Sequence, residues 1–232
     1  MPRPQPPANS CPQAAPLQRH ALPSAMVQPA DHIDGRLRYA TLVNGRTRIL
    51  PTWLLTTSDR HVAARVAMLL GGELNIDDHG GEQSYQVLTR YAQLDVLLDG
   101  PQAILLHMLR RHGSTVLRSC NSRTQQTPHG ERPCQCPAAL KARWEVAKTG
   151  RGCEPLIHLT CRLADDPALG RFLFSSAAWT FAEHASAVRV AIGRCRRPVL
   201  TRLGIDRALH ATAGGTTFAC TQPTLMVLPN AS

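Results

Sequence analysis

Residues 36–55, RLRYATLVNGRTRILPTWLL, decide how this chain begins to fold. Every second residue from Leu37 to Val43 is aliphatic, aromatic or β-branched, which is the period of a β-strand. Asn44-Gly45 follows, and this pair favours a two-residue hairpin turn because both turn residues take positive φ. The stretch therefore predicts a β-hairpin whose second strand reaches about Leu55.

Beyond the hairpin, candidate helices are separated by further candidate strands. Ser58 can cap a helix that ends at Gly71-Gly72, and Thr180 with Glu183 forms a possible capping box for another. Pro137 can open a third helix that ends at Gly150. The expected strands are 85–98, 156–163, 171–175, 199–209 and 217–228, and the segment 103–118 fits either a helix or a hairpin. This mixture predicts an α+β fold of antiparallel hairpins with two to four helices.

Residues 1–30 differ from the rest, because they are rich in Pro, Ala and Gln and show no periodicity. We expect a disordered tail over 1–30 and a single globular region over 31–232. Aromatic residues make up only 4% of the chain, so the core must depend on aliphatic side chains. Neither a secretory signal nor a membrane-spanning apolar run is visible, and we expect a cytoplasmic protein with no membrane contact.

The net charge of +10 is concentrated in one part of the chain. Nine basic and two acidic residues in 101–153 give this segment a charge of +7. Such a segment suits nucleic acid or an acidic protein surface, although a solvated basic face is the alternative interpretation. The candidate contact residues for DNA or a protein partner are Arg118, Arg123, Arg132, Lys141, Arg143, Lys148 and Arg151.

Four cysteines, Cys120, Cys134, Cys136 and Cys153, lie within this basic segment. In a reducing compartment, metal binding is a better explanation for such a group than a disulfide framework. The surrounding loops are rich in Gly, Pro and polar residues, so burial alone cannot hold their shape. We therefore predict one structural Zn²⁺ bound by the four thiolates, within an insert that spans about 118–153.

The spacing leaves other interpretations open. Cys134-Gln135-Cys136 is one residue tighter than the usual C-x-x-C pair of zinc sites. His112 or His129 could replace one thiolate, and the cysteines could also be free or redox-active.

Sequence motifs for catalysis are weak in this chain. His129-Gly130-Glu131 and Pro133-Cys134 are similar to the H-x-E and P-C-x-x-C motifs of zinc deaminases. In those enzymes the two motifs lie on separate helices, whereas here a single residue separates them. Phosphate-binding, dinucleotide-binding and hydrolase motifs are missing as well, so we expect no enzymatic activity and no small-molecule substrate.

Several segments in order resemble the recombination directionality factors that partner large serine integrases of phages and integrated elements in actinobacteria. The similarity spans roughly residues 33–228. The segments that carry it are 43–46, 51–53, 69–72, 99–101, 120–121, 134–137, 150–155, 162–165, 169–172, 176–183 and 221–228.

The resemblance implies a non-enzymatic protein that binds a serine integrase on attachment-site DNA. Such a factor biases site-specific recombination toward excision, while the integrase performs the strand exchange. Direct contact with DNA is a further expectation, and binding would occur at the bacterial nucleoid. The alternative function is a zinc-stabilised basic module that binds nucleic acid by itself.

Overall fold

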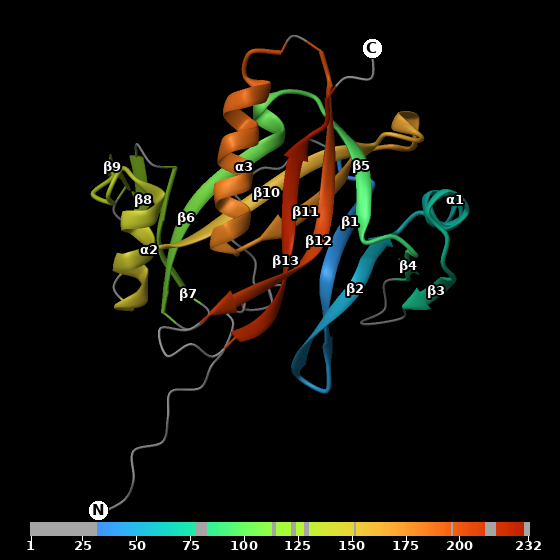
Figure 1. Cartoon of the computed structure of the whole chain (residues 1–232), viewed down its shortest axis with the longest axis horizontal. Helices are drawn as coiled ribbons and strands as arrows, with labels where there is room; N and C mark the ends of the chain where they lie inside the picture. The colour runs from blue at the N-terminus through green and yellow to red at the C-terminus, as the bar shows by residue number, and fades with distance from the viewer. Residues whose placement is uncertain are drawn as a thin grey trace, which may run out of the picture.

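The computed structural model describes residues 32–77, 83–112, 115–121, 124–127, 130–150, 152–195, 197–211 and 217–229. The tail predicted over 1–30 lies outside these residues. Within the described part, three α-helices accompany a large, mostly antiparallel sheet, so the α+β prediction is confirmed (Figure 1).

The hairpin predicted at the start of the fold is present. Strand β1 (Gly35–Val43) pairs antiparallel with β2 (Arg46–Thr57), and the pairing closes at Val43 and Arg46. Asn44 and Gly45 have φ values of 51° and 72°, as this turn requires.

One long run of paired strands follows the order β3-β4-β2-β1-β11-β10-β6-β7-β8-β9. Each printed pair within this run is antiparallel except β1 with β11, which is parallel. Strand β5 pairs with the end of β10 and continues the sheet into β12 and β13. The remaining bounds are β3 (Leu74–Asp77), β4 (Ser84–Leu88), β5 (Gln93–Leu98), β6 (Ile104–His112), β7 (Thr115–Cys120), β8 (Thr124–Thr127), β9 (Gly130–Pro133), β10 (Glu154–Leu163), β11 (Phe172–Ser176), β12 (Val199–Ala211) and β13 (Thr217–Val227).

Two sequence expectations about strands are now resolved. The segment 103–118, which fitted helix or hairpin, forms the β6–β7 hairpin after the short 3-10 helix η1 (Pro101–Ala103). The strand predicted over 85–98 is instead divided into β4 and β5. The chain turns between them because the backbone N–H groups of Thr89 and Arg90 donate to the carbonyls of Trp53 and Leu70.

Helices α1 (Arg60–Leu70) and α3 (Trp179–Ile192) cover the sheet, and both bury an apolar face. The N-cap of α1 is Asp59, whose carboxylate accepts the His61 N–H at 2.7 Å, so the prediction of Ser58 was wrong by one residue. Helix α3 begins after Ala178 with no side-chain cap, so the predicted capping box is absent. None of the helices in the described ranges has both the length and the apolar composition needed to pass through a bilayer.

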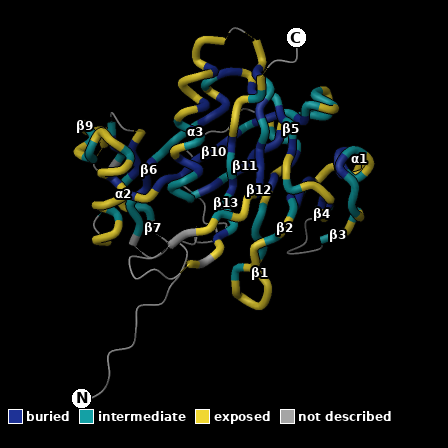
Figure 2. Tube along the Cα trace, in the orientation of Figure 1, coloured by how far each residue is buried: buried dark blue, intermediate teal, exposed yellow. Residues whose placement is uncertain are grey.

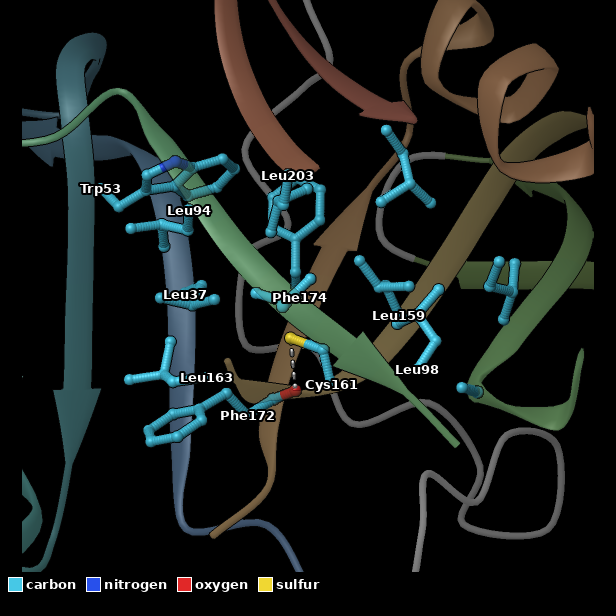
Figure 3. Packing of buried hydrophobic residues seen from close by; sticks show 14 of the residues in the cluster. Leu37, Trp53, Leu94, Leu98, Leu159, Cys161, Leu163, Phe172, Phe174 and Leu203 are labelled. Carbon is cyan, nitrogen blue, oxygen red and sulfur yellow. Dashed lines mark hydrogen bonds between the residues drawn. The ribbon is translucent and has the colours of Figure 1, made fainter. Parts of the chain in front are cut away.

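The main core is the large cluster of buried side chains between the long sheet, the β5–β12–β13 layer and helices α1 and α3. Trp53, Phe174 and Phe181 are fully buried, and both Trp53 and Phe181 lie edge-on to the Phe174 ring with centroids 5.1 Å apart. Figure 3 shows the side chains of Phe174 and Leu203 converging from different strands. The aliphatic core expected from composition is therefore organised around a few aromatic rings.

Candidate metal centre

The sheet topology brings the four cysteines of the basic segment to one place. Cys120 ends β7, and Cys153 immediately precedes β10. Both strands flank β6, where Met108 pairs with Cys120 on one side and with Pro155 on the other. The short β8–β9 hairpin then returns the chain so that the two remaining cysteines follow Pro133.

Three of these four sulfur atoms lie within reach of a single ion, and the fourth lies beside one of them. The Sγ atoms of Cys120, Cys134 and Cys136 all lie within 4.8 Å of one another. The Sγ of Cys153 lies 3.8 Å from that of Cys136, and all four residues are free thiols. In a regular tetrahedron with Zn–S bonds of about 2.3 Å, the sulfurs are about 3.8 Å apart. We call these four residues the cysteine centre.

The cysteine centre has a small buried cluster of its own. Cys120 and Cys153 are buried together with Met108, and Cys134 and Cys136 pack against them half-buried. Trp179, the first residue of α3, also contacts this cluster. The cluster is therefore tied to the main core through α3 and the shared strands β6 and β10.

Helix α2 (Leu140–Lys148) covers the cysteine centre, although little apolar burial holds it in place. It begins three residues after Pro137, the predicted first residue, and has no side-chain cap. Gly152 passes directly beneath it, since a Cβ at this position would lie 2.5 Å from the backbone nitrogen of Ala147. Only glycine permits this approach, which brings Cys153 under the helix.

The thiols differ in their readiness to ionise. A hydrogen bond from Cys120 lowers the pKa of Cys153 to about 5 against the effect of burial, and the Arg118 guanidinium acts in the same direction. Burial, together with the negative charge of Cys153, raises the pKa of Cys136 to about 11. Burial opposes ionisation of Cys134, but hydrogen bonds from the Cys136 N–H and the Cys120 thiol lower its pKa overall. Because thiolates are the metal-binding form of cysteine, this environment is compatible with a metal ion.

The predicted contact residues fall into three groups. Arg132, Lys141 and Lys148 are exposed around α2 and β9, where Figure 2 shows mostly exposed chain. Arg143, by contrast, is 4% exposed, and Arg118 is half-buried with a nitrogen 3.3 Å from the Cys153 sulfur. Arg123 and Arg151 lie outside the described residues.

Arg143 cannot belong to an exposed contact surface, because its side chain is directed into the cysteine centre. The sequence offered a signal for this orientation. Arg143 lies three residues after Leu140 and four before Ala147, which is the spacing of one helical face. Of the alternative ligands, His129 and the side chain of His112 lie outside the described residues.

A family model described as Gp3-like, recombination directionality factor-like, matches residues 27–211. This match covers most of the 232 residues, and the chain belongs to this family. No solved structure matches the chain.

Proposed function

We propose that the chain is a recombination directionality factor that binds a serine integrase on attachment-site DNA and biases recombination toward excision. The family match over residues 27–211 carries this proposal. A partner protein changes the direction of a reaction only when it binds one integrase–DNA arrangement more tightly than another. The factor therefore needs a rigid, complementary surface rather than catalytic groups, and it would act in the bacterial cytoplasm at the nucleoid.

Recombination by the cognate integrase tests this function directly. With purified integrase, the chain should stimulate recombination between attL and attR and should inhibit recombination between attP and attB. Stimulation without any change at attP and attB would indicate a general activator, and no stimulation would remove the proposal.

Exposed basic residues near the cysteine centre are the proposed partner surface. Replacing Arg132 and Lys141 with Glu should weaken the stimulation of excision by reversing charge on this surface. Arg60→Glu is the matched control, because Arg60 is exposed at the start of α1, in a different element. Equal activity of both variants would place the docking surface elsewhere on the molecule.

We also propose that the cysteine centre binds one structural Zn²⁺ through all four thiolates. The support is the mutual proximity of three sulfurs within 4.8 Å and the fourth at 3.8 Å from Cys136. Four protein thiolates complete the tetrahedral coordination shell of a zinc ion and leave no open coordination position for catalysis. The ion would hold β7, β9, α2 and β10 together, where apolar burial is small.

Native mass spectrometry of the purified chain should show one zinc ion per molecule. The ion should be lost in Cys134→Ser and retained in Cys195→Ser, since Cys195 is exposed and lies outside the centre. A wild-type protein in which β8, β9 and α2 stay ordered without metal after chelation would refute the structural role.

The high charge of 101–153 favours a second candidate function, direct binding to nucleic acid. Such binding would be measurable on bare DNA without integrase and would weaken steeply as salt is raised. Base stacking on Trp144 would be hindered, because the Lys148 ammonium already lies 3.8 Å from the centre of its ring.

A further inference from the structure

We propose that Arg118 and Arg143 are positioning residues that offset the charge of the metal centre, an inference that rests on the proposed zinc site. Four thiolates and one Zn²⁺ carry a net charge of −2, and two guanidinium groups carry +2. The two arginine side chains thus lie beside the cysteine centre and offset its charge. Arg132, Lys141 and Lys148 are exposed and remain available to a partner.

Arg118 reaches the centre from strand β7. Its Nη2 lies 3.3 Å from the Sγ of Cys153, and its Nη1 donates to the Oε1 of Gln125 at 3.3 Å. Gln125 is itself buried and pairs with Cys120 across β7 and β8, which fixes the position of the guanidinium. Among the described residues, Arg118 forms no ion pair with a carboxylate, so sulfur is the negative group that it meets.

Arg143 reaches the centre from helix α2. Its Nε donates to the carbonyl oxygen of Pro137 at 2.5 Å, directly after the third cysteine in the sequence. At 4% exposure, its side chain is buried almost completely. A buried guanidinium stays protonated and requires a negative partner nearby, because an isolated charge in the interior is strongly unfavourable.

Both arginines border the same small cavity. This cavity has a volume of about 80 Å³, and Cys136 and Cys153 form part of its wall. The guanidinium groups therefore approach the centre around one shared space. Groups that hydrogen-bond to metal ligands orient them and typically change metal affinity by about 10–100-fold when mutated.

Zinc competition against a chelator of known affinity tests the inference. Arg118→Gln, which removes the charge but keeps N–H donors, should weaken zinc binding by about 10–100-fold. Arg118→Lys, which keeps the charge, should recover most of that loss. A merely structural role for the side chain would not separate Gln from Lys in this way. Arg143→Met should weaken binding further when combined with Arg118→Gln.

Arg132→Gln and Lys141→Gln are the controls, because both residues are exposed and should leave zinc affinity unchanged. Wild-type affinity in Arg118→Gln would overturn the inference while leaving the zinc site intact. Equal weakening in Arg118→Gln and Arg118→Lys would also overturn it, because charge would then be irrelevant. If Arg143→Met fails to fold, the Gln and Lys variants of Arg118 decide. A wild-type chain that binds no zinc would instead refute the site itself.

Discussion

The main core and the cysteine centre share strands β6 and β10 but are stabilised by different interactions. In the main core, two layers of strands and two helices bury aliphatic and aromatic side chains against one another. In the cysteine centre, the buried cluster of the described residues consists of Met108 with Cys120 and Cys153. Helix α2 beside it buries the charged Arg143, whereas α1 buries Val62 and Val66.

This difference indicates which region can hold its shape without a ligand. Burial of apolar surface contributes about 25 cal/mol per Å², and the main core has ample surface of this kind. Around the cysteine centre, by contrast, lie polar loops and two cationic side chains, for which burial alone is unfavourable. We therefore expect the two regions to respond to different perturbations.

Removal of the proposed zinc ion should have the largest effect. The loss of order should be confined to the elements around the cysteine centre. Structural zinc contributes about 10–16 kcal/mol to the folding of small zinc domains, so β8, β9 and α2 should lose their order. Hydrogen–deuterium exchange with and without a chelator measures this, and β11 and β12 should stay protected. Uniform deprotection of both regions would show that the main core depends on the ion too.

Phe174→Ala should have the next largest effect and should act on the main core. Removing a fully buried aromatic ring typically destabilises a protein by about 3–5 kcal/mol. Chemical denaturation should show this loss, while the folded variant should bind as much zinc as the wild type. Tyr91→Ala is the control: Tyr91 is 54% exposed, and its replacement should change stability little.

Acid should weaken the sheet through His158, which lies on β10 between the two regions. Burial lowers the pKa of His158 to about 4, and the nearby His107 and Arg36 act in the same direction. The unfolded chain therefore binds more protons at this residue between pH 6.5 and 4, so stability falls as the pH falls. The loss should approach about 3 kcal/mol near pH 4.

Denaturation between pH 7 and 4 tests this effect. His158→Gln can retain a hydrogen bond to the Ser175 hydroxyl, which lies 2.8 Å from His158 Nδ1, but cannot titrate. This variant should lose much of the pH dependence, whereas His61→Gln at an exposed site should retain it. An unchanged pH profile in His158→Gln would contradict the assignment.

Asp59→Ala should have the smallest effect, since α1 is held mainly by its buried face. Loss of an N-cap side chain typically destabilises a protein by about 1 kcal/mol. Thermal denaturation can compare it with Ser58→Ala, which leaves the observed cap intact. A larger effect of Ser58→Ala would mean that the cap lies where the sequence pattern placed it.

Local signals predicted the regular parts of the fold well. Asn44-Gly45 located the first hairpin, and the strands expected over 156–163, 199–209 and 217–228 correspond to β10, β12 and β13. Helix caps were less predictable, because both Ser58 and Asp59 suit an N-cap and only the packed structure selects one. The division of 85–98 into two strands depends on hydrogen bonds to distant residues, which no local pattern records.

The grouping of the cysteines could be predicted, because the four thiols occur close together in sequence among polar loops. The structure brings the sulfurs of Cys120, Cys134 and Cys136 within 4.8 Å of one another. The inward orientation of Arg118 and Arg143 was harder to see, since a basic residue in a basic segment usually faces solvent. The positions of these two side chains depend on the return of the β8–β9 hairpin and on the placement of α2, which are properties of the tertiary structure.

The parallel pairing of β1 with β11 has a consequence for the order in which the chain folds during synthesis. Gly35 pairs with Phe172, so β1 cannot pair with β11 until 137 further residues have been synthesised. All four residues of the cysteine centre are translated before Phe172. Contacts between distant residues form slowly because a long loop must close first. A nascent chain can thus bring together its local hairpins and its four clustered cysteines before the sheet closes.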